Sequence, residues 1–134
     1  MSVATVRDAM TRGVVSCAPE LCLREAARLM TDSNVRALIV IDGACGLAGI
    51  VSQTDLVNAT LQHPTTPDWQ MLPVHQVMTR EVLTVHPDES LARAAKRMVD
   101  GNVHRLVVVD DSDAECKPIG VISVGDIMRR LAKE

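Results

Sequence analysis

An internal repeat constrains this chain more than any other feature. A shift of 68 positions lays residues 6–42 over residues 74–110 without a gap. Identical residues recur in register, among them Met10-Thr11-Arg12 with Met78-Thr79-Arg80, Pro19 with Pro87, and Asn34-Val35 with Asn102-Val103. After a three-residue difference in one loop, where repeats tolerate length changes, residues 49–56 lie over residues 120–127. Two copies of one structural unit are therefore predicted.

Each repeat has the pattern of a strand, a helix, two strands and a second helix. In both first helices, apolar residues at positions i, i+3, i+4 and i+7 predict one buried stripe, made of Leu23, Ala26, Ala27 and Met30 or of Leu91, Ala94, Ala95 and Met98. Runs rich in β-branched residues predict strands over 14–16, 37–41 and 49–52, and over 82–84, 105–109 and 120–123. The second helices are predicted to begin near Thr54 and Gly125.

The boundary between the repeats is predicted from a polar connector. Residues 62–68 carry two prolines, which cannot continue the preceding helix. We expect a first unit over 1–61, a linker over 62–73 and a second unit over 74–134. Trp69, Met71 and Leu72 are apolar, so we expect them to dock against the body, with Trp69 as a packing residue. Units of about 60 residues bury little surface, so the two are expected to depend on each other.

The repeats resemble paired CBS domains, which are regulatory modules found alone or attached to kinases, transporters, channels and metabolic enzymes. The resemblance covers nearly the whole chain and rests on the repeat openings VRDAMTRGVVSCAP and VHQVMTREVLTVHP, the runs LIVID and VHRLVVVD, and the endings GIVSQTD and GVISVGD. It implies an α/β fold in which two β-α-β-β-α units pack by pseudo-twofold symmetry into one stand-alone module. It also implies two clefts at their junction, which hold adenosine derivatives in many members.

The repeated Ser-x-x-Asp motifs are the candidate binding residues. Ser52 and Ser123 end a strand where a helix starts, and a helix N-terminus offers N–H groups and partial positive charge to a phosphate. Asp55 and Asp126 each offer two acceptor oxygens, which suit the paired hydroxyls of a ribose, and the resemblance implies this use. Alternatively, Ser-x-x-Asp is close to a capping box that only stabilises its helix. Capping and binding do not exclude each other.

The two repeats differ around this motif. His104-Arg105-Leu106 resembles a segment of nucleotide-binding CBS units in which the arginine contacts phosphate, although arginine is also common at solvated strand edges. The first repeat has Arg36-Ala37 there, so its guanidinium is absent or displaced by one residue. The second repeat has Gly125 where the first has Thr54. For a phosphorylated ligand we expect the Ser123, Asp126 and Arg105 site to bind more tightly than the Ser52, Thr54 and Asp55 site.

The resemblance also implies an adenine pocket made of backbone groups and small apolar side chains. The corresponding positions are Val15, Cys17, Ala37 and Leu38 in the first repeat, and Leu83, Val85 and Leu106 in the second. Such residues are equally typical of a strand core.

Other functional classes lack support in the sequence. An enzyme needs a nucleophile with a base, paired carboxylates or a metal cluster, and the four histidines have no repeated carboxylate or cysteine partner (His63, His75, His86 and His104). The cysteines show no C-x-x-C spacing, which disfavours zinc and disulfides (Cys17, Cys22, Cys45 and Cys116). A net charge of −3 and a single aromatic residue disfavour nucleic acid. We therefore expect no catalytic residues and no metal.

The sequence favours a regulatory module that binds an adenine nucleotide or related adenosyl ligand between its two units and requires no other cofactor. The rival is a structural or protein-interaction subunit that binds no nucleotide. No apolar run approaches the roughly 18 residues of a membrane span, and residues 1–10 lack a signal-peptide pattern, so a cytoplasmic protein is expected. We also expect a separate effector protein as partner and a homodimer formed through helices that carry Met30, Leu61, Met98 and Met128.

Overall fold

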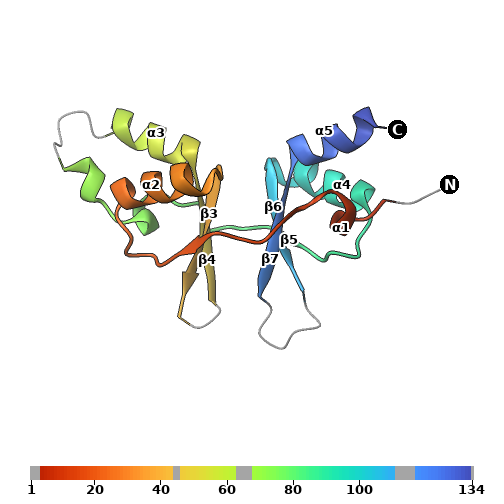
Figure 1. The fold of residues 1–134 in the computed structure, drawn as a ribbon, viewed down its shortest axis with the longest axis horizontal. Coiled ribbons are helices and arrows are strands. Elements are labelled where there is room, and N and C mark those ends of the chain that lie inside the picture. The colour runs from red at the N-terminus through yellow and green to blue at the C-terminus, as the bar shows by residue number, and fades with distance from the viewer. Residues whose placement is uncertain (1–3, 44–45, 63–67, 111–116, 134) are drawn as a thin grey trace. The chain divides into compact units, whose positions relative to one another are not determined.

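The computed structural model describes residues 4–43, 46–62, 68–110 and 117–133, and the chain forms two compact units (Figure 1). One unit is the continuous stretch Val15–Glu81, which we call the inner unit. The other joins Met1–Val14 to Val82–Glu134, and we call it the outer unit because its two segments flank the inner unit along the chain. Both units combine one sheet with helices, in agreement with the predicted α/β class.

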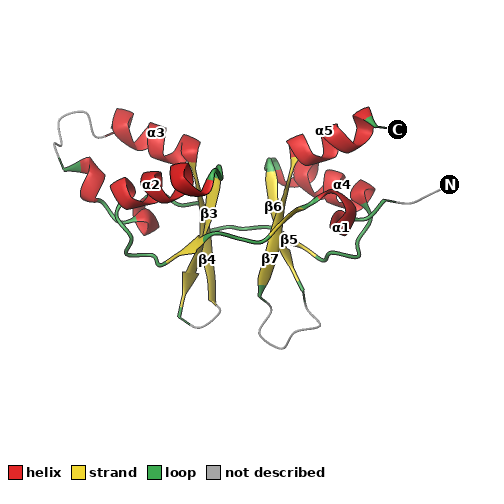
Figure 2. Ribbon diagram, in the orientation of Figure 1, coloured by secondary structure: helices red, strands yellow, loops and turns green. Residues whose placement is uncertain are grey.

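The inner unit is a three-stranded sheet covered by helices on one face (Figure 2). Its elements are β2 (Ser16–Cys17), α2 (Leu23–Ser33), β3 (Ala37–Asp42), β4 (Gly46–Ser52), α3 (Gln53–Gln62), and the short 3-10 helices η1 (Trp69–Met71) and η2 (Val74–Gln76). The strand order is β2-β3-β4, with β2 parallel and β4 antiparallel to β3. A strand parallel to its neighbour needs a crossover connection, and α2 supplies it.

The outer unit repeats this arrangement with one additional strand. Its elements are α1 (Val6–Ala9), β1 (Thr11–Arg12), β5 (Thr84–Val85), α4 (Leu91–Gly101), β6 (Arg105–Val109), β7 (Pro118–Ser123) and α5 (Val124–Ala132). The strand order is β1-β7-β6-β5, and only the β5–β6 pair is parallel. The predicted order of strand, helix, strand, strand and helix is thus present in both repeats.

Each core lies between the sheet and the first helix of its repeat. In the inner unit Leu23, Ala26 and Met30 pack on Leu38, Val40 and Val51, and in the outer unit Ala94 and Met98 pack on Val85, Leu106, Val108 and Ile122. The predicted stripe is wrong at Ala27, which is exposed because the sheet covers only the 23, 26 and 30 side of α2. Met30 and Met98 are 2% and 3% exposed, so they are core residues and unavailable to a partner.

The compact units do not coincide with the sequence repeats, because the opening of each repeat joins the sheet of the other repeat. Thr11 and Arg12 pair with β7, and Val6 is fully buried in the outer core. Conversely, Thr79 exchanges two backbone hydrogen bonds of 2.9 and 3.0 Å with Ile50, and Val74 is fully buried in the inner core. Each sheet therefore gains an edge partner that lies far away in the sequence.

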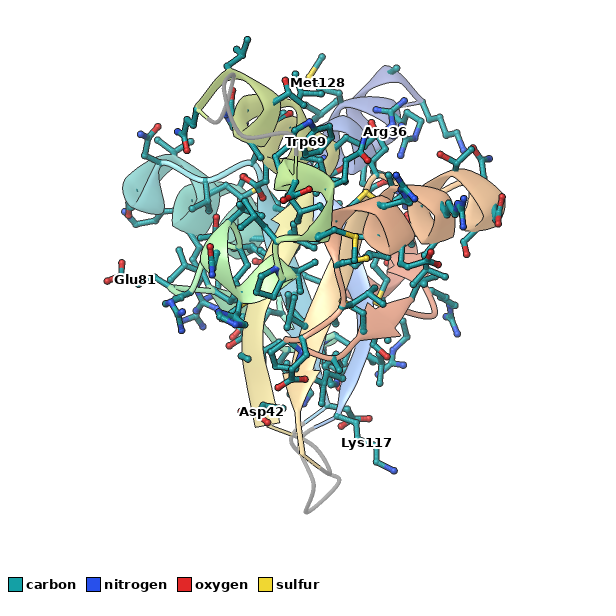
Figure 3. All side chains as sticks on the ribbon, turned by 90° about the vertical axis from the view of Figure 1, so that its left-hand side faces the viewer. Arg36, Asp42, Trp69, Glu81, Lys117 and Met128 are labelled. Atoms are coloured by element: carbon teal, nitrogen blue, oxygen red, sulfur yellow. The ribbon has the colours of Figure 1, made fainter. Side chains whose placement is uncertain are left out.

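The apolar residues after the connector behave differently from one another. Trp69 and Leu72 pack against the inner core, as predicted, and Figure 3 shows Trp69 on η1 beside the helices of that unit. Met71 does not dock, because the single turn of η1 leaves it 61% exposed. Connector residues 63–67, with His63, lie outside the described residues, as do Cys45 and Cys116. No helix in the described ranges is long and apolar enough to cross a membrane.

Candidate functional site

The candidate site of the inner unit is the junction at which β4 becomes α3. Ser52 is the last residue of the strand, and its backbone N–H donates a hydrogen bond of 2.8 Å to Asp55 Oδ2. In return, the Asp55 N–H donates to Ser52 Oγ at 3.2 Å. We call this pair, Ser52 and Asp55, the inner junction.

The outer unit contains the same junction in Ser123 and Asp126, which we call the outer junction. The reciprocal distances are again 2.8 Å from Ser123 N to Asp126 Oδ2 and 3.2 Å from Asp126 N to Ser123 Oγ. This is a capping box, and it explains why α5 begins directly after β7. The capping interpretation is therefore confirmed for both motifs, and whether they also bind a ligand depends on what their remaining atoms contact.

The helix starts offer fewer amide donors than expected. The first amide of each helix donates a hydrogen bond to the carbonyl of the residue that directly precedes the middle strand. Gln53 N donates to Arg36 O, and Val124 N donates to His104 O, both at 3.0 Å. The third amide, that of Asp55 or Asp126, is used in the capping box. The middle amide, at Thr54 or Gly125, belongs to the first turn, whose amides have no acceptor within their own helix. Each junction thus has one first-turn N–H available to an anion.

The two carboxylates differ in their second oxygen. Asp126 Oδ1 accepts a hydrogen bond from the Arg129 guanidinium one turn along α5. No described residue donates to Asp55 Oδ1, and the residue one turn along α3 is Asn58. The sequence interpretation missed Arg129, although an arginine three residues after an aspartate on a helix is a recognisable pairing signal.

The strand register brings the residue at the start of the middle strand to each junction. Arg105 lies directly opposite Ser123, and Ala37 lies opposite Ser52. The strand register thus places Arg105 beside the outer junction, and it places the methyl group of Ala37 beside the inner one. Arg36 is exposed and precedes β3, at the end of that strand opposite to Asp42 (Figure 3). Arg36 and His104 contact the helix starts through their carbonyl oxygens, which accept hydrogen bonds from Gln53 N and Val124 N.

The residues expected to line an adenine pocket fall into two groups. Leu38, Val85 and Leu106 are buried among core side chains, on the strand face that alternation turns toward the helices. Val15, Cys17, Ala37 and Leu83 are half-buried. The carbonyls of Val15 and Leu83 accept hydrogen bonds of 3.0 and 3.1 Å from Ile39 N and Val107 N. Burial raises the pKa of the Cys17 thiol.

A basic groove runs along α4 of the outer unit, apart from the junction. It is lined by Leu83, Arg93, Lys96, Arg97, Asp100 and Gly101. Its charges are partly paired, because Lys96 contacts Asp100 at 2.8 Å and Arg97 contacts Glu89 at 3.4 Å. Of the expected site residues, only Leu83 belongs to it. Among the described residues, no three His, Cys, Asp or Glu side chains gather closely enough to hold a metal ion.

Comparison with known proteins identifies both repeats. The family model described as CBS domain matches residues 6–62 and again residues 74–133. The chain is 28% identical over 95% of its length to a homoserine O-acetyltransferase of Methanosalsum zhilinae. It spans only about a quarter of the length of that relative and of several other curated relatives.

Solved structures with the same fold include complexes with adenosine derivatives. The CBS domain pair of protein MJ0100, in complex with 5'-methylthioadenosine and S-adenosyl-L-methionine, has a TM-score of 0.81, 26% identity, and coverage of 96% of this chain and 99% of that one. CBSX2 in complex with AMP has a TM-score of 0.75, 28% identity, and coverage of 96% of both chains. These similarities extend over both repeats.

Proposed function

The chain belongs to the CBS domain family, and from that premise we propose that it is a regulatory module that binds adenosine-containing nucleotides and signals to a separate protein. The observation that carries the proposal is the duplicated Ser–Asp junction. Each copy presents an aspartate beside a helix start that has one available amide. The complexes of related CBS structures with AMP, S-adenosyl-L-methionine and 5'-methylthioadenosine support the same ligand class.

The chemistry of the junction suits a nucleoside. A ribose has two neighbouring hydroxyl donors, and a carboxylate is an acceptor with two oxygens. In the inner junction Oδ2 of Asp55 already accepts from Ser52, while Oδ1 faces no donor among the described residues. The free amide of the helix start and, in the outer junction, Arg105 add donors for a phosphate.

Regulation follows if the ligand binds one conformation of the chain more tightly than another, and coupling of a few kcal/mol is typical. In this proposal the module performs no catalysis of its own. Its output is the conformation that an effector protein recognises. The rival function, a protein-interaction subunit without nucleotide, draws support from the capping boxes, because both motifs already have a structural use.

A thermal-shift screen with AMP, ADP, ATP, S-adenosylmethionine and NAD tests the proposal. A ligand at about one hundred times its dissociation constant stabilises the fold by about 2.7 kcal/mol, which raises the melting temperature by several degrees. The matched control is the double variant Asp55→Asn and Asp126→Asn, which keeps an oxygen for each cap and removes both carboxylates. The shift should shrink strongly in this variant. If none of the five ligands shifts the wild type, the interaction-subunit function replaces this one.

The proposed assembly is a homodimer that covers the second helix of each repeat. Leu61 on α3 and Met128 on α5 are 72% and 59% exposed, and Val57 and Leu131 are exposed beside them. Such apolar side chains gain free energy when a second copy covers them. Sedimentation velocity at micromolar concentration should give the mass of a dimer, and Leu61→Glu with Met128→Glu should give a monomer. A monomeric wild type contradicts the assembly.

A further inference from the structure

The outer junction contains an ion pair that the inner junction lacks. The Asp126 side chain is 5% exposed, and its two oxygens accept hydrogen bonds from Ser123 N and from the Arg129 guanidinium. The Arg129 side chain is 70% exposed, so only its guanidinium end is held, and it can rotate away into solvent. In α3 the equivalent position is Asn58, which is exposed and forms no hydrogen bond with Asp55.

We infer that Arg129 determines ligand specificity at the outer junction by making Asp126 available only to phosphorylated nucleosides. The inference rests on the proposed function, because it assigns the ribose to Asp126. A neutral nucleoside that approaches the carboxylate competes with Arg129 for Oδ1 and offers the guanidinium nothing in return. A nucleotide brings a phosphate to which the displaced guanidinium can bind, so one charged pair replaces another.

The inner junction does not select against neutral nucleosides. Asp55 Oδ1 is unpaired within the described part of the chain, so a neutral ribose displaces no cation. No arginine lies opposite Ser52, where Ala37 stands. The two junctions of one chain therefore divide the ligands by charge: the outer one selects phosphorylated nucleosides, and the inner one accepts neutral nucleosides such as adenosine.

Exchanging the residues at the two equivalent positions, Arg129 of α5 and Asn58 of α3, tests the inference. Asp55→Asn should remove ligand binding at the inner junction. In that background, Arg129→Asn gives α5 the residue that α3 has at the equivalent position, Asn58. Calorimetry should show that Arg129→Asn binds adenosine about tenfold more tightly, and AMP more weakly, than the Asp55→Asn parent does. A tenfold change in affinity is the scale of one charge-assisted hydrogen bond. The reciprocal change, Asn58→Arg in an Asp126→Asn background, should weaken the binding of adenosine and strengthen the binding of AMP.

Two controls separate specificity from structure. Arg129→Lys keeps the positive charge and should keep the preference for AMP. Arg28→Asn breaks another ion pair between residues three apart, to Glu25 on α2, and should leave both affinities unchanged. Thermal unfolding of each variant confirms that it folds.

The outcomes are distinguishable. If wild type binds none of the five ligands of the thermal-shift screen, the proposed function fails and this inference fails with it. If wild type binds one of those ligands but neither adenosine nor AMP, the inference alone is overturned. If wild type binds, and Arg129→Asn leaves the affinities unchanged or changes both by the same factor, the proposed function stands and the inference alone is overturned. Opposite changes for the two ligands, reversed by Asn58→Arg at the other junction, support it.

Discussion

Two asparagines show how single residues set the geometry of both repeats. Asn34 and Asn102 end α2 and α4 in the left-handed conformation, with φ values of 55° and 52°. This conformation strains most residues, while glycine and asparagine adopt it readily. It turns the chain from the helix into the middle strand, whose first residue lies opposite the junction serine.

The first prediction concerns this helix end. Asn102→Ala should destabilise the protein by about 1 kcal/mol because alanine is strained at positive φ. Asn102→Gly should be close to neutral, because glycine has no Cβ to clash. Urea denaturation of both variants measures the difference. Equal stability of the alanine and glycine variants would contradict the conformational explanation.

The second prediction concerns Asp8 at the start of α1. The hydrogen bond from the Thr5 amide, of 2.9 Å, lowers the pKa of Asp8, with further help from the Thr5 hydroxyl and the charges of Arg130 and Arg7. Because folding lowers this pKa, ionised Asp8 stabilises the protein fully above the ordinary value of 3.8 and loses its effect as the pH falls through the folded value. Asp8→Asn should therefore lose less stability than wild type between neutral and acidic pH in urea titrations. Equal losses contradict this role.

At the scale of elements, the exchanged openings depend on two glycines. A Cβ at Gly120 of β7 would lie 2.5 Å from the Thr11 carbonyl oxygen. A Cβ at Gly49 of β4 would lie 2.7 Å from the Thr79 carbonyl oxygen. Only glycine lets the opening backbone approach so closely, which gives the repeated glycine of GIVSQTD and GVISVGD a structural reason.

The third prediction follows from this contact. Gly120→Ala and Gly49→Ala should each destabilise the fold by about 1–3 kcal/mol, because the obstructing atom belongs to backbone and cannot rotate away. The control is Gly125→Ala in α5, where the nearest atoms to a Cβ are 3.6 Å away. That change should stabilise the helix by about 0.5–1 kcal/mol. If calorimetric unfolding gives the same effect for Gly120→Ala and Gly125→Ala, the opening does not pack as described.

At the scale of the whole molecule, the repeat and the folding unit are different stretches of chain. The family model matches residues 6–62 and 74–133, whereas the compact units are Val15–Glu81 and the two segments that flank it. A fragment that contains one sequence repeat lacks the opening that completes its sheet. Domains of about 60 residues are marginally stable even when complete, so this loss is serious.

The fourth prediction compares two fragments of equal length. The fragment 15–81 contains the whole inner unit, with Val74 in its core and Thr79 at its edge. The fragment 1–67 contains the first repeat and lacks these residues. We expect a cooperative thermal transition by circular dichroism for 15–81 and none for 1–67. A cooperative transition for 1–67 alone would show that the opening of a repeat serves its own repeat.

The sequence by itself determined the duplication, the element order, most core positions and the paired junctions. Hydrophobic periodicity and turn residues act over short distances along the chain. The burial of Leu23 and Met30 and the position of the Ser-x-x-Asp motifs could therefore be predicted from the neighbouring residues alone. The tertiary structure decided which repeat each opening joins, because Thr11 and Thr79 find their partners through backbone hydrogen bonds. The glycines that admit these openings, Gly120 and Gly49, do not specify which opening approaches them. It also decided that Leu38, Val85 and Leu106 are core residues, because packing fixes which face of a strand is buried. Packing likewise fixes the strand register that places Arg105 opposite Ser123. It also fixes the side-chain rotamer with which Arg129 contacts Asp126.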